Sequence, residues 1–275
     1  RQRQMFIRDS STKVIYINYS DANYRRNQNQ LIHHVRTELK DEFQGCIPYT
    51  REWLVTKDFY KDNRRILDKD RLAGYTIWKP YIILTAFEEI NEGDIVVYMD
   101  CGDIPWYGLR DKVWKFMHGF DHYLLEQYPQ NLNRAYTKRD CFYYMGCDEE
   151  RYWDAPQVEG GFMAWKKTES SVHLLNEYIK YCTDERIVTD IPNQCGLPNL
   201  PEFKDHRHDQ SVISNMQVKH GLVTVTAKES VDGEYGAGKM DWGAGSHIKW
   251  NMLFHRNGKQ FANGTYKWGP EGRIK

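Results

Sequence analysis

One short segment constrains the fold of this chain more than any other. The stretch Gly93–Asp100 reads GDIVVYMD, so an almost uninterrupted apolar run ends abruptly in an acid. Strands that are apolar on both faces lie in the middle of a sheet that helices cover on both sides. Because predicted strands and helices alternate along the chain, we predict an α/β fold.

The residues before this run predict a β-α-β start. Lys13–Asn18 is apolar, β-branched and aromatic, and the polar cluster Tyr19–Asn23 follows it, which indicates a buried strand opening into a loop. Apolar residues recur at helical spacing in Arg25–Phe43, and Cys46–Tyr49 is a second extended stretch. Later segments predict helices at Lys79–Ile90, Trp114–Gln127, Ser170–Thr183 and Asp209–His220, a short strand at Val158–Ala164, a loop at Ile187–Lys204 and a mobile glycine-rich stretch at Gly233–Gly245.

The composition excludes several classes of protein. The 38 Lys and Arg balance 38 Asp and Glu, so the chain lacks the basic character of a nucleic-acid-binding protein, and no nucleic-acid partner is predicted. No run approaches the roughly 18 consecutive apolar residues of a membrane helix, and the mean hydropathy is −0.77. We therefore expect no transmembrane segment and a soluble, cytoplasmic protein, located in the host cytoplasm if the chain is viral.

The two acids after the apolar run are the sharpest chemical feature. Asp100 and Asp103 flank a glycine-containing turn at the carboxyl end of the predicted strand, where open α/β sheets bind their ligands. Two carboxylates placed this way can bind one hard cation, Mg²⁺ or Mn²⁺, and leave coordination positions for phosphate oxygens. A cation held there can neutralise a departing diphosphate. The alternative is that Asp100 caps a turn and Asp103 is solvated.

The apolar strand followed by clustered acids resembles the Asp-x-Asp motif of nucleotide-sugar-dependent glycosyltransferases of the GT-A fold. The spacing departs from that motif, because two residues instead of one separate the two acids. Other segments resemble small capsule-type and large algal-virus glycosyltransferases, in the same order along the chain. They are Gly74–Tyr81, which precedes the metal-motif strand; Glu159–Met163, a small-residue strand near the donor sugar; Arg207–Ser211, an Asp-Gln segment at a helix start; and Phe254–Lys259, a terminal His-x-x-Gly-x-Lys.

The resemblance implies a single GT-A-like, Rossmann-like domain over residues 1–275, with a central, mostly parallel sheet flanked by helices; no repeat or linker divides the chain. Residues 13–110 would form the nucleotide-binding half, and residues 111–275 the acceptor-binding half with a C-terminal closing segment. The implied activity is metal-dependent transfer of a sugar from a nucleoside-diphosphate sugar, with a UDP-sugar favoured, to a glycan acceptor. The implied cofactor is Mn²⁺ or Mg²⁺, held by Asp100, Asp103 and, from the terminal motif, His255.

Several residues in these segments also have a physical reason to bind a donor. Lys79 lies at a predicted helix start, where an ammonium group and free backbone N–H groups suit phosphate; an exposed lysine is the alternative. Trp78 and Tyr75 can stack on uracil or a sugar ring, or can pack in the core. Gly160 and Gly161 let the backbone approach a bound sugar, or form a β-bulge.

Asp209 is the candidate catalytic residue. If the reaction inverts the anomeric centre, which we favour, Asp209 is the base that deprotonates the acceptor hydroxyl. If the reaction retains configuration, Asp209 and Gln210 hold the donor sugar and stabilise positive charge at the anomeric carbon. The structural alternative is that Asp209 only caps the N-terminus of the helix. Arg207 and His208 can contact phosphate, and Lys259 can reach the β-phosphate. The complete set of predicted donor-binding residues is Asn18, Tyr19, Ser20, Tyr75, Trp78, Lys79, Asp100, Gly160, Gly161, His208, Gln210 and Lys259.

Two other functions fit parts of the sequence. A metal-dependent phosphohydrolase could be built on Asp100, Asp103 and His255, although such sites usually have more acidic ligands. A non-catalytic carbohydrate-binding protein would explain the 19 Tyr and 9 Trp. A carbohydrate-binding protein binds glycans with or without a chelator, whereas the metal-dependent transferase loses nucleotide binding or turnover when the cation is removed.

Overall fold

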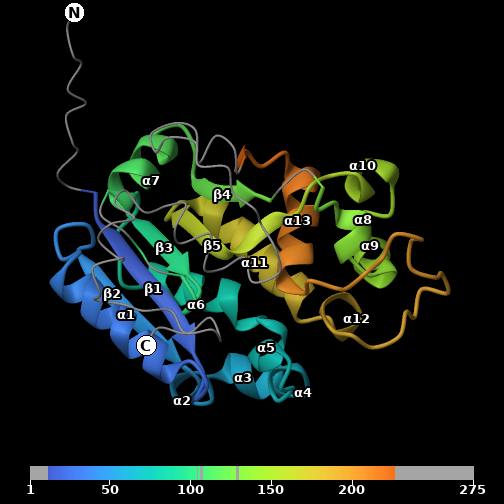
Figure 1. The fold of residues 1–275 in the computed structure, drawn as a ribbon, viewed down its shortest axis with the longest axis horizontal. Helices are drawn as coiled ribbons and strands as arrows, with labels where there is room; N and C mark the ends of the chain where they lie inside the picture. Colours follow the sequence, from blue (N-terminus) through green and yellow to red (C-terminus); the bar gives the residue numbers. More distant parts are fainter. Residues whose placement is uncertain (1–11, 104, 106–107, 128–129, 227–275) are drawn as a thin grey trace, which may run out of the picture.

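The computed structural model describes residues 12–103, 105, 108–127 and 130–226, and this part of the chain folds around one mixed sheet (Figure 1). The strand order is β2-β1-β3-β5-β4-β6. The strands are β1 Val14–Ser20, β2 Gly45–Thr50, β3 Ile95–Met99, β4 His122–Glu126, β5 Val158–Lys166 and β6 Thr224–Thr226. The pairs β1–β2, β1–β3 and β4–β6 are parallel, and β5 is antiparallel to both of its neighbours. The predicted α/β fold with a mostly parallel sheet is confirmed.

The reversed strand β5 decides what meets at one edge of the sheet. Its register pairs Met99 with Phe162, so the middle of β5 lies beside the end of β3 and the first residues of β5 extend past that end. The backbone N–H of Asp100 then donates to the carbonyl of Gly161 at 2.9 Å. Residues that are about sixty positions apart in the sequence therefore share the edge where β1 and β3 end.

Helices cover both faces of the sheet. The first core layer packs α6 (Trp78–Phe87), α11 (Glu169–Cys182) and α13 (Asp209–His220) against one face, and the second packs α1 (Arg25–Thr37) and α7 (Leu109–Met117) against the other. Successive residues of β3 alternate between the layers, since Val96 and Tyr98 belong to the first and Ile95, Val97 and Met99 to the second. All five are buried, as the apolar run predicts, and each contributes about 1.5–3 kcal/mol of hydrophobic stabilisation.

Short helices complete the described part. They are α2 Arg51–Leu54, α3 Asp58–Asp62, α4 Arg64–Leu67, α5 Leu72–Tyr75, α8 Asn133–Tyr136, α9 Arg139–Tyr144, α10 Glu150–Trp153 and α12 Glu185–Val188. In Figure 1, α8, α9, α10 and α12 lie beyond α13, at the end of the molecule away from β2. Among the described helices, none is at once long and apolar enough to cross a membrane.

One predicted element is wrong. The helix expected over Trp114–Gln127 is two elements, because α7 ends at Met117 and His122–Glu126 forms β4. Tyr123 and Leu125 enter one core layer and Leu124 the other, so the apolar run is a strand buried on both faces. A short apolar run of this kind has no periodicity that separates it from a buried helix.

The helix predicted over Asp209–His220 is α13 with the same bounds, and other predicted elements are present with shifted ends. The helix predicted over Arg25–Phe43 ends at Thr37, and the one predicted over Lys79–Ile90 ends at Phe87. The loop predicted from Ile187 begins inside α12. The glycine-rich stretch predicted at Gly233–Gly245 lies outside the described residues.

Candidate functional site

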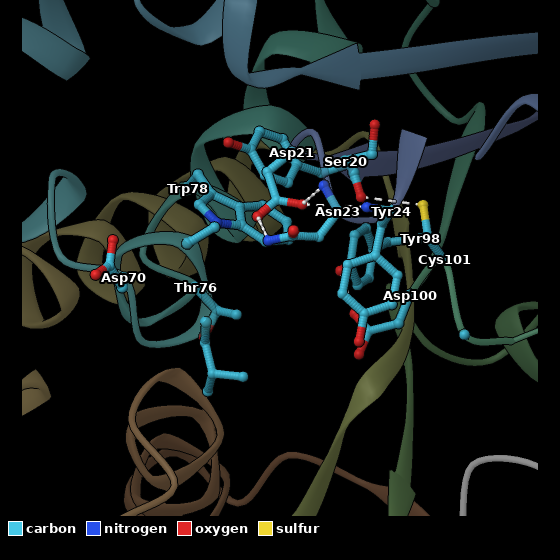
Figure 2. Close-up of a pocket in the computed structure, with 14 residues that line it drawn as sticks. Ser20, Asp21, Asn23, Tyr24, Asp70, Thr76, Trp78, Tyr98, Asp100 and Cys101 are labelled. Carbon is cyan, nitrogen blue, oxygen red and sulfur yellow. Dashed lines mark hydrogen bonds between the residues drawn. The ribbon is translucent and has the colours of Figure 1, made fainter. Parts of the chain in front are cut away.

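A cavity of about 290 Å³ opens at the sheet edge where β1 and β3 end. Figure 2 shows Trp78 and Thr76 on one side of it and Tyr98, Asp100 and Cys101 on the other. Its walls come from the end of β1, the segment before α6, the start of α6 and the turn after β3. The lining residues are Tyr19, Ser20, Asp21, Asn23, Tyr24, Asp70, Leu72, Ala73, Thr76, Trp78, Tyr98, Asp100, Cys101 and Gly102.

The wall before α6 is a left-handed turn. All five residues of Leu72–Thr76 have positive φ, between 50° and 87°. This conformation costs about 1–2 kcal/mol for each residue other than glycine. At Gly74 a side chain is excluded outright, because an added Cβ would lie 2.6 Å from the Cα of Leu67. Backbone strain of this kind persists where the surrounding structure enforces it, and here it shapes a cavity wall.

Beneath the cavity, Lys79 and Asp209 form a buried ion pair. The Lys79 Nζ lies 2.6 Å from an Asp209 carboxylate oxygen and donates to the carbonyl of Gly160 at 2.7 Å. The two residues are 2% and 3% exposed. Burial alone would lower the pKa of Lys79, but Asp209 and then Asp100 outweigh it and raise that pKa above its usual value, so the ammonium stays charged.

Asp209 accepts three side-chain hydrogen bonds. Besides Lys79, the hydroxyl of Thr76 donates to Oδ1, and the hydroxyl of Tyr178 donates to Oδ2 at 3.1 Å. Burial, followed by the charge of Asp209, raises the pKa of Tyr178 well above its usual value, so this phenol remains a donor. The carboxylate is therefore fixed by the left-handed turn, α6 and α11 together.

A second group of carboxylates surrounds Gly161. The position that a Cβ on Gly161 would occupy lies 2.9 Å from Asp103 Oδ2, 3.2 Å from Glu159 Oε1 and 3.4 Å from Asp100 Oδ2. The hydroxyl of Tyr98 donates to Asp100. The backbone N–H of Gly161 donates to Glu159 at 3.0 Å. Glycine at position 161 thus leaves the space into which three acidic oxygens point.

Asp103 is the least satisfied of these acids. It is 6% exposed, and its Oδ1 has no hydrogen-bond partner among the described residues. Burial, then the charges of Asp100 and Glu159, raises the pKa of Asp103 well above its usual value. A carboxyl group in such surroundings is either neutral or, as a carboxylate, needs a compensating positive charge.

These side chains fit a hard divalent cation by their chemistry. All the available atoms are carboxylate oxygens, the donors that Mg²⁺ and Mn²⁺ prefer. Within residues 12–226 as far as they are described, no three His, Cys, Asp or Glu side chains already stand in a ligating arrangement. The predicted ligand His255 and the predicted phosphate contact Lys259 lie outside the described residues.

The structure brings part of the predicted donor set to the cavity. Tyr19, Ser20, Trp78 and Asp100 line it directly. Tyr19 and Trp78 stack on each other with ring centroids 3.9 Å apart, and burial raises the pKa of Tyr19 to about 12. The indole N–H of Trp78 is buried and has no partner among the described residues.

Other predicted residues lie away from the cavity. Asn18 is a fully buried residue of β1, and its side-chain oxygen accepts from Gln28 at 3.0 Å. The ring of Tyr75 packs against His208, which is buried and donates through Nδ1 to the carbonyl of Val188 at 2.8 Å. Burial lowers the pKa of His208, so this ring is neutral at pH 7. Arg207 is exposed and its guanidinium lies over the ring of Tyr136.

Sequence reasoning missed four residues of the site. Glu159 belongs to the segment Glu159–Met163, whose sequence signal lies in the two glycines and not in the acid. Thr76, Tyr98 and Tyr178 have no local signal, because each becomes relevant only through an acid that folding places beside it. Tyr24 and Leu72, which are 47% and 55% exposed, give the cavity an apolar rim that the sequence also did not indicate.

Comparison with known proteins gives distant likenesses in structure. No protein-family model matches the chain, and no curated protein matches its sequence. The fold is similar to apo mouse xyloside xylosyltransferase 1, at 11% identity and a TM-score of 0.42 over 80% of this chain and 86% of that one. It is also similar to a glycosyltransferase involved in glycosylation of the major capsid of PBCV-1, at 10% identity and a TM-score of 0.37 over 70% of this chain and 81% of that one.

A third solved structure is the glycosyltransferase GlyE of Streptococcus pneumoniae TIGR4. It matches at 14% identity and a TM-score of 0.38, over 88% of this chain and 51% of that one. All three TM-scores lie below 0.5, so the function proposed next rests on the residues of the site.

Proposed function

We propose that this protein is a metal-dependent glycosyltransferase that moves a sugar from a nucleoside-diphosphate sugar, with a UDP-sugar favoured, to a glycan acceptor. The observation that carries the proposal is one sheet edge holding two charged groups beside a cavity. One group is the set of carboxylates around Gly161, and the other is the buried Lys79–Asp209 pair. The first suits a cation that binds diphosphate, and the second suits the polar ring of a sugar.

The charge of the site supports a cation. Asp100, Asp103, Glu159 and Asp209 are buried or half-buried carboxylates. In the part of the chain that the structure describes, Lys79 is the one cationic side chain within ion-pair distance of any of them. If all four carboxyl groups were ionised, three formal negative charges would stay uncompensated, and burial together with Asp100 and Glu159 accordingly raises the pKa of Asp103. A bound Mn²⁺ or Mg²⁺, held by Asp100 and Asp103 with His255 as the predicted third ligand, would supply the positive charge that stabilises a departing diphosphate.

In this proposal the remaining residues of the site bind the donor sugar and hold one another in position. The ammonium of Lys79 and the carbonyl of Gly160 present a donor and an acceptor at the start of β5. Asp209 keeps its orientation through Thr76, Lys79 and Tyr178. These three donors take up most of the acceptor positions of the carboxylate, and both roles of Asp209, as the acceptor's base or as a contact of the donor sugar, stay predictions.

One observation supports a second candidate function. A metal-dependent phosphohydrolase needs more acidic ligands than two, and Glu159 adds a third carboxylate beside Asp100 and Asp103. The two functions differ in what they bind, since a phosphohydrolase releases phosphate from simple esters and needs no nucleotide.

The test is calorimetric titration of UDP, with GDP as the control nucleotide, in Mn²⁺ and again in EDTA. We expect UDP binding that requires Mn²⁺ and is lost in Asp100→Ala, but kept in Asp62→Ala, which removes an exposed carboxylate on α3. Transfer from UDP-sugars would then be screened. Absence of nucleotide binding under both conditions would overturn the proposal, and release of phosphate from simple esters would favour the phosphohydrolase.

A further inference from the structure

Three side-chain amides are hydrogen-bonded in a row that ends at the backbone of Gly160, beside Lys79. Asn133 begins α8, Gln157 precedes β5, and Gln210 lies in the first turn of α13. The Nε2 of Gln157 lies 2.9 Å from Asn133 Oδ1, and the Nε2 of Gln210 lies 2.6 Å from Gln157 Oε1. Asn133 and Gln157 are completely buried.

Backbone groups at the two ends fix the direction of this line. At one end, Asn133 donates through Nδ2 to the carbonyl of Tyr152 at 3.0 Å, and a carbonyl can only accept. At the other end, Gln210 Oε1 accepts from the backbone N–H of Gly160 at 3.2 Å, and an N–H can only donate. Reversing any one amide would place two donors or two acceptors face to face, so all three have one consistent orientation.

The middle amide has little freedom to turn. The Nε2 of Gln157 also donates to the hydroxyl of Thr137 at 3.2 Å. Its backbone is fixed as well, because its N–H donates to the carbonyl of Asn131 at 2.9 Å and its carbonyl accepts from the N–H of Gln127 at 2.7 Å. Gln157 therefore presents its oxygen, and never its nitrogen, to Gln210.

We propose that Gln157, oriented by Asn133, is a positioning residue that makes Gln210 present its amide oxygen to the donor sugar. The inference rests on the proposed glycosyltransferase function. The position that a Cβ on Gly160 would occupy lies 3.2 Å from Gln210 Oε1 and 3.5 Å from Lys79 Nζ, so this oxygen and the ammonium flank the same backbone position. Gln210 is only half-buried, whereas the two amides behind it are sealed in the core.

The direction of the amide matters for the chemistry. An amide oxygen beside the anomeric carbon can accept from a sugar hydroxyl or stabilise the positive charge that develops as the glycosidic bond breaks. The reversed amide would direct an NH₂ group toward Lys79 and Gly160, which are already donors, and toward that positive charge. A residue that prevents this reversal acts on turnover more than on nucleotide binding.

The first experiment compares Gln157→Met with Gln217→Met. Both remove an amide that donates a hydrogen bond near α13, but Gln217 donates to the carbonyl of Leu222 at the far end of that helix. For Gln157→Met we expect kcat to fall about 10- to 100-fold, less than the roughly 100- to 1,000-fold loss when a preorganised group that contacts the reacting atoms is itself removed, while the KM for the donor and the affinity for UDP change less than about threefold. Gln217→Met should keep the wild-type kcat.

A conservative pair tests the orienting step. Asn133→Asp keeps an acceptor for Gln157 Nε2, whereas Asn133→Leu removes it, so the aspartate variant should retain several-fold more kcat than the leucine variant. Equal losses in the two variants, or an unchanged kcat in a folded Gln157→Met, would overturn the inference while wild-type turnover leaves the proposed function standing.

The wild-type protein gives a test that needs no variant to fold and no activity. In a deuterated sample, side-chain NOEs should connect the NH₂ of Gln210 with Gln157, and its exchange with water should be slower than that of an exposed glutamine. In the proposed orientation the N–H of Gly160 faces Oε1, so its NOE to that NH₂ should be weak; a strong NOE, as between protons in direct contact, would overturn the orientation. Loss of UDP binding in the wild type would instead overturn the proposed function, so the two failures are distinguishable.

Discussion

Replacing Gly161 with alanine should weaken cation binding without unfolding the sheet. The added methyl group would lie 2.9 Å from Asp103 Oδ2 and 3.2 Å from Glu159 Oε1, so at least the Asp103 carboxylate has to move. Overpacking of a close-packed site costs about 1–3 kcal/mol. If that cost falls on the cation-bound state, the affinity for Mn²⁺ should drop roughly 5- to 150-fold, because each 1.4 kcal/mol is tenfold.

Gly102→Ala is the matched control for this change. Gly102 lines the same cavity, but a Cβ there would meet nothing within 4 Å. Mn²⁺ is titrated calorimetrically into the wild type and both variants, and the thermal midpoint of each is measured to show that each is folded. The reasoning would be refuted by wild-type Mn²⁺ affinity in Gly161→Ala, or by equal weakening in Gly102→Ala.

Three further changes follow from the buried charges. Lys79→Met leaves the Asp209 carboxylate buried without its cation, so we expect the free energy of unfolding in urea to fall by about 3–5 kcal/mol; a loss under about 1 kcal/mol would contradict the buried ion pair. Asp209→Asn keeps an oxygen that accepts from its neighbours but cannot take a proton, so donor turnover should persist at a reduced rate if Asp209 holds the sugar, and abolished transfer with intact UDP binding would assign it the base role. Burial lowers the pKa of both His206 and His208 from the usual 6.5, so the unfolded chain binds more protons below that pH. The two rings should therefore lower the free energy of unfolding as the pH drops from 7 to 5.5, by up to about 1.4 kcal/mol per pH unit for each ring, whereas Asp103, whose pKa is raised, acts in the opposite direction. Urea titrations of Asp103→Asn, which lacks that opposing group, check this, with the exposed His33 replaced by glutamine in the same background as the control that keeps the slope.

The parts of the fold predicted correctly are those whose signal is local. The run before Asp100 has to be buried on both faces whatever surrounds it, so its central place in the sheet follows from its side chains alone. The strand at His122–Glu126 has a similar apolar run but directly follows a true helix, and the sequence pattern did not separate the two. Its identity depends on pairing with β5, more than thirty residues later, which no local pattern contains.

The residues of the candidate site differ in the same way, because some have a local sequence signal and others are placed only by contacts between distant segments. Asp100 and Lys79 were found because each follows a recognisable element boundary. Their partners were not, since Glu159 approaches Asp103 only because β5 runs antiparallel to β3, and Tyr178 approaches Asp209 only because α11 packs against α13. The left-handed turn before α6 has the same origin, because Gly74 is required by the backbone of Leu67 and not by any feature of its own neighbours in sequence. A sequence can therefore indicate where an acidic residue follows the end of a strand. The balance of charges around that residue decides what it binds, and this balance is set by contacts between distant segments.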